Sequence, residues 1–363
     1  MDDWLIDDDR LSIGRKSVLP GEGFFIPDSY EEEQAEAEAA ETLDDAGVVV
    51  IADPDADGLA CTALIRQAHG EGALLPAGPH ELTEALEWTA EYADPGVTVF
   101  ICDLCPDRES DIAPLGSLVD TAERVVWFDH HQWPDDLADD VDAAGVERTV
   151  GDSDEVCTAD VALSELDYDF DEQWADLAAV TRDHDLWIRD DPRSDDLADL
   201  SYWSEPEEYI EAVRDHGPDL SPEFHEFLDE KRVEKEALIE KAVDRAELRD
   251  VGEWTVGVTY GRCSQNEVAE ALREQGADAA VIVKPAGSAS IRGTDSFERA
   301  HEVAQQVNGG GHPKAAGCKP DIYDDMMDYA HHWTTQGAVA KQAIVDAFRR
   351  LPEEEEEGTD TEQ

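Results

Sequence analysis

Long apolar runs are missing from this sequence of 363 residues. The longest runs have the length of a strand, and none approaches the roughly 20 residues that cross a bilayer as a helix. No positively charged start precedes an apolar segment, so the sequence does not indicate a secretory signal. We therefore expect a soluble, cytoplasmic protein that makes no contact with a membrane.

Basic residues are also scarce, because 27 Lys and Arg stand against 90 Asp and Glu, for a formal net charge of -63. A high net charge is typical of disordered chains, but apolar periodicity persists through most of this one, which also has nine tryptophans. We interpret the charge as the surface of a folded protein adapted to molar salt, in which repulsion is screened within about 3 Å. That interpretation predicts a halophilic archaeal host.

The cysteines also lack the regular spacing that is typical of a disulfide-bonded protein. The six cysteines are scattered along the chain, which is typical of a reducing compartment. Cys102 and Cys105 form a C-x-x-C pair, but no second pair and no histidine pair stands at zinc-finger spacing. We expect ordinary buried thiols there and no structural zinc.

Three short apolar runs predict an α/β fold with a parallel sheet. They are GVVVIADPD at 47–55, GVTVFICDL at 96–104 and RVVWFDHHQ at 124–132. Runs of this length that are rich in Val, Ile and Phe are typical of buried parallel strands, and the segments between them have helical spacing. Helices are expected at 59–69, 159–166 and 172–183.

The rest of the chain predicts a second, smaller α/β domain. Residues 222–250 have helical periodicity with no internal Gly or Pro, which indicates one long connecting helix. Strands are expected at 253–261, 277–285 and 288–293, with a helix at 266–274. The predicted segments are an acidic, solvated N-terminal extension at 1–45, the first domain at 46–221, the connecting helix at 222–250, the second domain at 251–350 and a disordered acidic tail at 351–363.

Acidic and histidine side chains follow each of the three predicted strands. They are Asp53, Asp55 and Asp57 after the first, Asp103 after the second, and Asp129, His130 and His131 after the third. A lone Asp at a strand end is more often a cap or turn residue. Because the carboxyl ends of parallel strands meet at one edge, however, these side chains should converge.

Converging carboxylates predict a divalent metal site, since they cannot all ionise at neutral pH without a cation. Oxygen-rich ligands with one or two imidazoles suit Mn²⁺ or Mg²⁺, and the number of ligands supports two ions, as in sites that hydrolyse phosphoesters. A further carboxylate stands at the end of LAAVTRDHDLW, 177–187. We choose Asp183 as the ligand, although spacing alone does not separate it from Asp185.

The full series of motifs resembles the DHH phosphoesterase superfamily. The motifs are DPDADG at 53–58, Asp103, the DHH triplet at 129–131, Asp183, SIRG at 290–293 and NGGGHPKAAG at 308–317. The resemblance covers roughly residues 47–320. It implies a DHH catalytic domain at 46–221 and a DHH-associated substrate-binding domain at 251–350, and the D-x-D-A-D-G pattern is similar to that of the RecJ-like single-strand exonucleases.

The resemblance also implies roles for individual residues. The implied metal ligands, for two Mn²⁺ or Mg²⁺ ions, are Asp53, Asp55, Asp57, Asp103, His130 and Asp183. The implied catalytic residues are Asp129, which supports the site or shares in ligation, and His131, which contacts the substrate phosphate and assists proton transfer. The implied phosphate-binding residues, across an interdomain cleft, are Arg292, Gly309, Gly310, Gly311 and His312. The implied reaction is in-line attack of water on phosphorus.

We therefore expect a 5′ exonuclease that acts on single-stranded DNA or RNA. Residues 281–320 fit a polyanionic substrate, because they hold five Lys or Arg against three acids. One alternative is a phosphodiesterase or phosphatase for oligoribonucleotides, cyclic dinucleotides or 3′-phosphoadenosine 5′-phosphate. Another is a non-catalytic RecJ-like replication scaffold, which would not need six metal ligands. The resemblance suggests partners in replication, repair or RNA processing, and the sequence does not indicate an oligomeric state.

Overall fold

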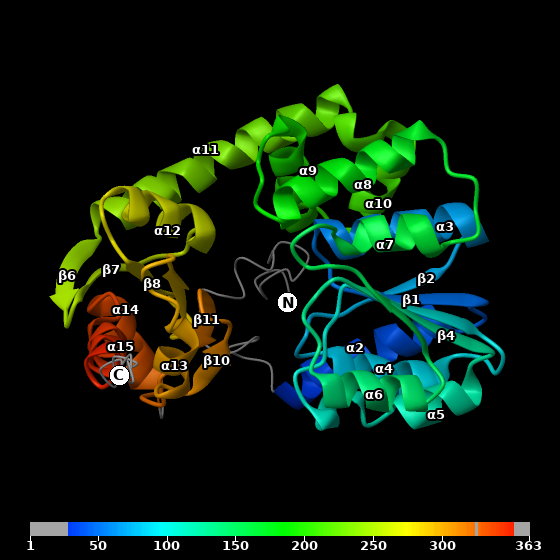
Figure 1. Cartoon of the computed structure of the whole chain (residues 1–363), viewed down its shortest axis with the longest axis horizontal. Coiled ribbons are helices and arrows are strands. Elements are labelled where there is room, and N and C mark those ends of the chain that lie inside the picture. The colour runs from blue at the N-terminus through cyan, green and yellow to red at the C-terminus, as the bar shows by residue number, and fades with distance from the viewer. Residues whose placement is uncertain (1–27, 324–325, 352–363) are drawn as a thin grey trace, which may run out of the picture. The chain divides into compact units, whose positions relative to one another are not determined.

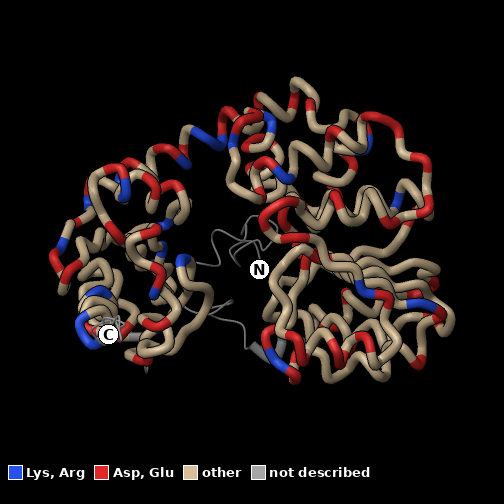
Figure 2. The backbone as a smooth tube through the Cα atoms, viewed as in Figure 1, with Lys and Arg blue, Asp and Glu red and all other residues tan. Residues whose placement is uncertain are grey.

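The computed structural model describes residues 28–323 and 326–351 (Figure 1). These residues fall into two compact units, Glu32–Lys231 and a second unit that begins at Arg232, here called the N-terminal and C-terminal units. The start of the predicted acidic extension and the acidic tail beyond Leu351 lie outside the described residues. Within the described ranges, no helix is both long and apolar enough to cross a membrane. Acidic residues are spread over both units (Figure 2).

The N-terminal unit is built on a five-stranded sheet in which every pair of neighbours is parallel. In spatial order its strands are β2 (Ala73–Pro76), β1 (Val48–Ala52), β3 (Thr98–Cys102), β4 (Arg124–Asp129) and β5 (Glu147–Val150). The structure confirms the predicted α/β class and the three predicted central strands. Edge strands β2 and β5 were not predicted, because β2 has only four residues and β5 is a polar, incompletely buried segment.

Alternate residues of the central strands are buried on opposite faces of the sheet. Val50, Phe100 and Val126 pack against one group of helices, whereas Val49, Val99 and Val125 pack against another. The first group is α3 (Ala56–His69), α7 (Thr158–Glu165), α8 (Glu172–Asp185), α9 (Pro192–Trp203) and α10 (Pro206–His216). The second is α2 (Asp28–Leu43), α4 (Leu82–Tyr92), α5 (Leu115–Thr121) and α6 (Asp135–Ala143). Helices thus cover both faces, as parallel sheets require (Figure 1).

Helix α2 is not the solvated helix that its acidic sequence predicts. Ala39 is 3% exposed and Leu43 is fully buried, and both belong to the core on the α4 and α5 side of the sheet. Tyr92 of α4 also donates a hydrogen bond from its hydroxyl to Glu36 Oε1, at 2.6 Å. Ala39 and Leu43 stand four residues apart and so share one face of the helix. The many acidic residues among the remaining positions of α2 obscure this narrow apolar stripe in the sequence.

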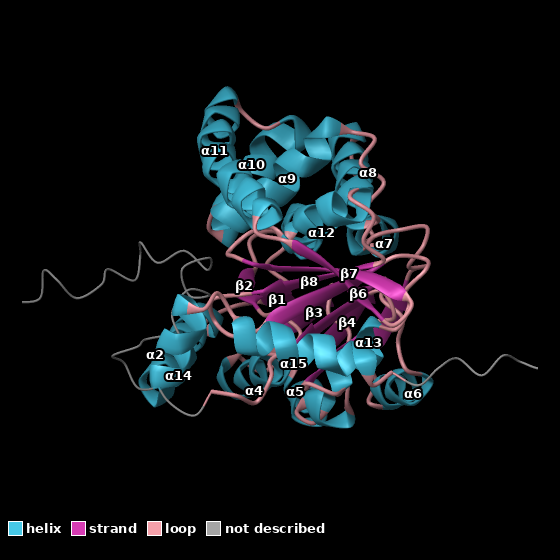
Figure 3. Cartoon of the chain, turned by 90° about the vertical axis from the view of Figure 1, so that its left-hand side faces the viewer, coloured by secondary structure: helices cyan, strands magenta, loops and turns pink. Residues whose placement is uncertain are grey.

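The C-terminal unit is a six-stranded mixed sheet with helices on both faces. Its strands, in spatial order, are β10 (Gly309–Gly311), β11 (Ala315–Cys318), β9 (Ala289–Gly293), β8 (Ala279–Val283), β7 (Trp254–Tyr260) and β6 (Glu247–Val251). Only β7 and β8 are parallel. One face packs against α12 (Gln265–Glu274), and the other against α13 (Ala300–Gln305) and α15 (Ala338–Arg349), with α14 (Met326–Thr334) beside α15 (Figure 3).

The connecting helix is shorter than predicted. Helix α11 covers Pro222–Asp244, whereas the prediction extended it to residue 250. Residues Glu247–Val251 instead form β6, which pairs with β7 through a turn at Gly252, a residue with a φ of 65°. The charged residues before this turn have helical spacing, so the sequence predicted a longer helix instead of the hairpin of β6 and β7. Strands β7, β8 and β9 and helix α12 confirm the other predicted elements of this unit.

Truncation of Leu43 tests whether α2 belongs to the core. We expect Leu43→Ala to lower the free energy of unfolding by about 2–5 kcal/mol, because it leaves a cavity beneath the sheet. Glu41→Ala, on an exposed position of the same helix, should change it by about 0.5 kcal/mol or less. Equilibrium unfolding in urea measures both, and equal stability of the two variants would show that α2 is solvated.

Candidate metal centre

The carboxyl ends of three neighbouring strands bring acidic residues to one edge of the N-terminal sheet. Strands β1, β3 and β4 are in register, so that Ala52 pairs with Cys102 and Cys102 with Phe128. The residues that follow these three are Asp53, Asp103 and Asp129. Asp103 has a φ of 58°, a left-handed backbone that is uncommon for a residue with a side chain. The chain thus departs from extended geometry directly after β3.

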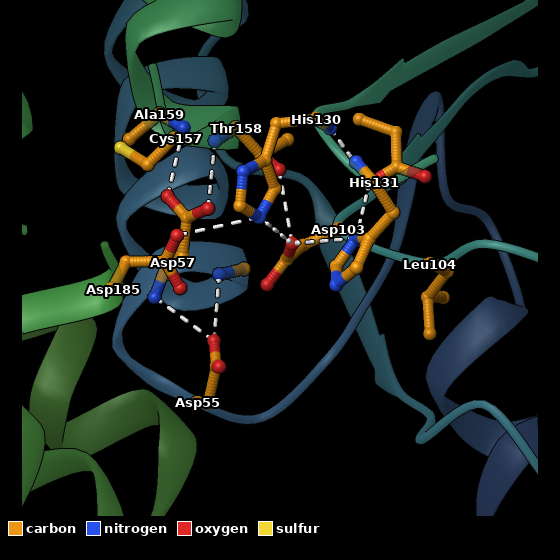
Figure 4. Close-up of polar contacts among 12 residues, drawn as sticks. Asp55, Asp57, Asp103, Leu104, His130, His131, Cys157, Thr158, Ala159 and Asp185 are labelled. Atoms are coloured by element: carbon orange, nitrogen blue, oxygen red, sulfur yellow. Dashed lines mark hydrogen bonds and ion pairs between the residues drawn. The ribbon is translucent and has the colours of Figure 1, made fainter. Parts of the chain in front are cut away.

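Two groups of potential metal ligands meet at this edge. One consists of Asp103, His130 and His131, and the other of Asp57, His130 and Asp185. Within each group the donor atoms all lie within 4.8 Å of one another, and His130 belongs to both groups (Figure 4). Helix α3 contributes Asp57, the segment after β4 contributes the histidines, and the last residue of α8 contributes Asp185. The two groups therefore form one continuous site.

The tautomer of His130 leaves lone pairs facing one another in this site. Its Nδ1 lies 3.0 Å from the carbonyl oxygen of Val156, which can only accept, so Nδ1 carries the proton. Burial lowers the pKa of His130 below its ordinary value and favours the neutral ring. The unprotonated Nε2 then lies 3.3 Å from Asp185 Oδ2 and 3.8 Å from Asp103 Oδ1. With the two carboxylates ionised, these three acceptors are the kind of atoms that a cation between them would bind.

An unpartnered oxygen supports the same interpretation. Asp185 Oδ2 is buried and has no hydrogen-bond partner among the described residues. A buried carboxylate oxygen without a donor carries a large desolvation cost, which a bound cation would offset. The residues of this site therefore fit a divalent cation with oxygen and imidazole ligands.

Burial and mutual repulsion make the carboxylates of this site weak acids. Burial, followed by the charge of Asp55, raises the pKa of Asp53 and of Asp57 to about 7. Burial, followed by the charge of Asp57, raises the pKa of Asp185 to about 8 and that of Asp103 well above its ordinary value. Without a cation, the protein resists full ionisation of this cluster at neutral pH.

Asp129 orients its neighbours, because its own oxygens are fully engaged. Its carboxylate is fully buried and accepts hydrogen bonds from the backbone N–H groups of His130 and His131, from His131 Nδ1 at 2.7 Å and from Trp133 Nε1 at 2.6 Å. Burial would raise the pKa of Asp129, but these hydrogen bonds outweigh it and hold the pKa below its ordinary value. The role of Trp133 was not predicted, since an isolated Trp after the DHH triplet carries no pattern.

His131 is held as a charged ring at the rim of the site. Its side chain is 45% exposed, although its Nδ1 is tied to Asp129. Burial of the rest of the ring favours the neutral form, yet the hydrogen bond and charge of Asp129 prevail and raise the pKa of His131 to about 9. The site thus combines a neutral His130 with a protonated His131.

Asp53 and Asp55, two of the predicted ligands, lie outside both groups of donor atoms. Asp55 is exposed and caps α3, because its Oδ1 accepts hydrogen bonds from the N–H groups of Asp57 and Gly58 at 2.9 and 3.1 Å. Asp53 is partly buried beside Asp55. The charge of Asp55 raises the pKa of Asp53 and of Asp57, so Asp55 and its neighbour Asp53 lie at the rim of the site.

The structure brings Asp185 to the site in place of Asp183, the predicted ligand. Asp183 is engaged elsewhere, since its two carboxylate oxygens accept hydrogen bonds from the N–H groups of Asp190 and Asp191, each at 3.1 Å. Its carboxylate therefore closes the turn between α8 and α9. Residues two apart on a helix point about 200° from each other, so only one of the two acids can face His130. Spacing left both possible, and packing of the turn decides between them.

Arg292, on β9 of the C-terminal unit, lies on the α12 side of the sheet. Its guanidinium donates to Asn266 Oδ1 at 2.9 Å and to the carbonyl oxygens of Ile291 and Ala316. Among the described contacts of Arg292 there is no carboxylate. In a chain with more than three acids for each base, a half-buried arginine without an acidic partner is available for an anion.

The predicted glycine cradle is the edge strand β10. Gly309 pairs with Cys318 and Gly311 with Ala316. A Cβ atom on Gly309 would lie 2.1 Å from the carbonyl oxygen of Gly317, and one on Gly311 2.6 Å from that of Ala315, whereas Gly310 has space around it. Close approach to β11 thus requires the two outer glycines, and a flexible loop is excluded.

The ladder nevertheless directs two amides away from β11. His312 and Ala315 exchange hydrogen bonds at the end of the hairpin, and such pairs alternate along an antiparallel ladder. Gly310 therefore bonds to β11, while the N–H groups of Gly309 and Gly311 face the other way. His312 is exposed beside them, and Lys314 is paired with Asp295 and Glu298.

Comparison with known proteins finds similarity in structure alone. No family model matches the sequence, and no curated protein matches it. The exonuclease RecJ bound to manganese is similar with a TM-score of 0.55 and 18% identity over 88% of this chain and 94% of that one. RecJ from Thermus thermophilus in complex with Mn²⁺ has the same TM-score and identity over 88% of this chain, which spans 55% of that longer chain. The pGpG-specific phosphodiesterase PggH from Vibrio cholerae gives a TM-score of 0.51 with 14% identity over 82% and 99% of the two chains.

At these identities the similarity establishes the fold. The chain has the α/β fold of the RecJ and PggH structures. The predicted fold is thereby confirmed, and the RecJ and PggH structures are among those that share it.

Paired variants of α8 test which acid binds metal. Asp185→Asn should weaken Mn²⁺ binding at least about tenfold, because it removes a charged ligand from the site. Asp183→Asn should leave the affinity within a factor of about three but lower stability by about 1–3 kcal/mol, since one amide of the turn loses its acceptor. Calorimetric titration and urea unfolding measure the two effects. If Asp183→Asn weakened Mn²⁺ binding and Asp185→Asn did not, Asp183 would be the ligand.

The raised pKa values predict how stability depends on pH without metal. The folded-state pKa values of Asp53, Asp57 and Asp185, about 7, 7 and 8, exceed the ordinary 3.8. Their contribution to stability is therefore fully present below pH 3.8 and is lost as the pH rises through 7 and 8. In chelator, we expect the melting temperature to fall as the pH rises from 3.8 to about 8 and to level off above that, and Mn²⁺ to reverse the fall.

The variant Asp185→Asn is the control for this effect, because an amide does not titrate. Its melting temperature in chelator should fall less steeply with pH than that of the wild type. Parallel curves for the two proteins would mean that the acidic cluster does not control the pH dependence.

Proposed function

We propose that this protein is a Mn²⁺- or Mg²⁺-dependent phosphodiesterase, and more specifically a RecJ-like 5′ exonuclease on single-stranded DNA or RNA. The observation that carries the proposal is the position of His130 Nε2, which lies 3.8 Å from Asp103 Oδ1 and 3.3 Å from Asp185 Oδ2, an oxygen with no hydrogen-bond partner among the described residues. The fold that the chain shares with RecJ bound to manganese supports the reaction class.

The proposed ligand set has a centre and a rim. Asp57, Asp103, His130 and Asp185 form the centre, and Asp53 and Asp55 join from the rim, which makes the set large enough for two ions. When bound, divalent cations lower the pKa of a coordinated water and offset negative charge on the phosphoryl oxygens.

The chain's own residues supply proton transfer beside the ligands. Because Asp129 holds Nδ1 of His131 and raises the pKa of the ring to about 9, His131 carries a proton at neutral pH. Its Nε2 remains as the donor for a phosphoryl oxygen or for the departing oxygen. An imidazolium in this position would stabilise the transition state and donate its proton to the departing oxygen.

Binding of the substrate phosphate is proposed for the C-terminal unit. Arg292 supplies a guanidinium without an acidic partner among its described contacts. The N–H groups of Gly309 and Gly311 and the exposed His312 supply further donors. Phosphate recognition by a guanidinium and backbone amides is common, and it does not depend on bulk positive charge.

Single strands fit the charge of the protein better than long duplexes. A net charge of -63 repels a polyanion, and in molar salt counterion release contributes little to affinity. Local hydrogen bonds, metal contacts and stacking of unpaired bases then carry the binding. Proteins of replication, repair or RNA processing are the proposed partners.

An activity screen tests the proposal. The full chain is incubated in molar KCl with Mn²⁺ and with 5′- or 3′-labelled single strands of DNA and RNA, alongside cyclic dinucleotides and pGpG. We expect stepwise release of mononucleotides from the 5′ end, and no release in chelator. Cleavage of dinucleotides alone would contradict the exonuclease and leave a small-substrate phosphodiesterase, while complete inactivity would point to a non-catalytic protein.

Asp103→Ala is the matching variant. We expect it to lower the rate by about 100- to 1000-fold or more, the scale for loss of one electrostatic contact in a transition state, while the fold is retained. Asp94→Ala is the control, because Asp94 is exposed and precedes the same strand at its amino end. A wild-type rate in Asp103→Ala would refute the site.

A further inference from the structure

The first turn of helix α7 donates hydrogen bonds to Asp57, one of the proposed metal ligands. The backbone N–H of Thr158 donates to Asp57 Oδ2 at 2.7 Å, and that of Ala159 donates to Asp57 Oδ1 at 2.8 Å (Figure 4). The first N–H groups of a helix have no partner within the helix. Asp57, which lies on α3, therefore satisfies two such groups of α7, and both of its oxygens are fixed in direction.

The side chain of Thr158 holds a second proposed ligand. Its hydroxyl donates to Asp103 Oδ1 at 2.9 Å. Thr158 is fully buried and Asp103 is 4% exposed, so water cannot replace this bond. Asp103 also has the left-handed backbone described above, a conformation that persists only where its surroundings hold it. Thr158 thus donates hydrogen bonds to the carboxylates of both Asp57 and Asp103.

The first turn of α7 is itself tied to the helix that carries a third ligand. Asp160 accepts a hydrogen bond from the N–H of Cys157 at 3.2 Å, and Arg182 of α8 donates to the same carboxylate at 2.8 Å. Asp185 ends α8. The turn that begins α7 therefore links the elements that carry Asp57, Asp103 and Asp185.

We propose that Thr158 is a positioning residue for the metal centre. Its hydroxyl and N–H set the directions of the Asp103 and Asp57 carboxylates, so that their remaining lone pairs meet near His130 Nε2, which lies 3.8 Å from Asp103 Oδ1. Partners that orient the ligands of a metal strongly influence its affinity. This inference rests on the proposed function, because it takes the cluster to be a metal centre.

Isosteric substitution tests this role. Thr158→Val keeps the shape of the side chain and the backbone N–H but removes the hydroxyl, so we expect Mn²⁺ to bind the full chain about 10- to 100-fold more weakly. Thr158→Ser restores the hydroxyl and should return the affinity to within about threefold of the wild type. Calorimetric titration with Mn²⁺ alone measures all three proteins.

Thr181→Val is the matched control. Thr181 lies on α8, is 1% exposed, and has a hydroxyl without a hydrogen-bond partner among the described residues. The same substitution there removes an equally buried hydroxyl that holds no ligand. Its Mn²⁺ affinity should equal that of the wild type.

The outcomes separate this inference from the proposed function. If the wild type binds Mn²⁺ and Thr158→Val binds it equally well, Thr158 is not a positioning residue, while the metal centre stands. A lower melting temperature of Thr158→Val in chelator with unchanged Mn²⁺ affinity would assign Thr158 a purely structural role and also overturn the inference. If the wild type itself does not bind Mn²⁺, both the proposed function and the role of Thr158 fail.

Discussion

Repulsion among buried carboxylates at one edge of the parallel sheet is the constraint on which the rest of the N-terminal unit depends. Asp57, Asp103 and Asp185 come from three different elements and share a buried space with the acceptor nitrogen of His130. Such an arrangement is unfavourable without a cation. Hydrogen bonds from the first turn of α7 hold the carboxylates of Asp57 and Asp103 in place. The turn after β3 and the end of α8 position Asp103 and Asp185. A fold that holds several carboxylates this close together is expected where a protein binds a cation.

Hydrogen bonding divides the acids around this site into two kinds. Asp129 and Asp183 are saturated by donors from the chain, so they orient a histidine and close a turn. Asp185 has an oxygen that no described donor reaches, which makes it available to a cation. Sequence spacing treats Asp183 and Asp185 alike. For these two residues, the engaged oxygens of Asp183 and the unpartnered oxygen of Asp185 separate the turn residue from the proposed ligand.

In the C-terminal unit the side chain without a partner of opposite charge is basic instead of acidic. Arg292 is half-buried without an acidic partner among its described contacts, although acids outnumber bases more than threefold in the chain. Its neighbours on β10 combine two purposes: the glycines permit close pairing with β11, and the ladder turns two of their amides outward. Packing alone explains Gly309 and Gly311, so a glycine-rich motif is not by itself evidence for a phosphate site.

The sequence by itself determined the α/β class, the three central strands, the long helix and the edge at which acids and histidines gather, because short apolar runs and strand-end residues are local patterns. It did not reveal edge strands β2 and β5, the hairpin of β6, the buried stripe of α2, or the contributions of Trp133 and Thr158. Those depend on contacts between segments far apart in the chain, as when Thr158 reaches Asp57 and Asp103. The choice of Asp185 over Asp183 was likewise decided only by the tertiary structure, because the turn after α8 consumes one carboxylate and leaves the other facing His130.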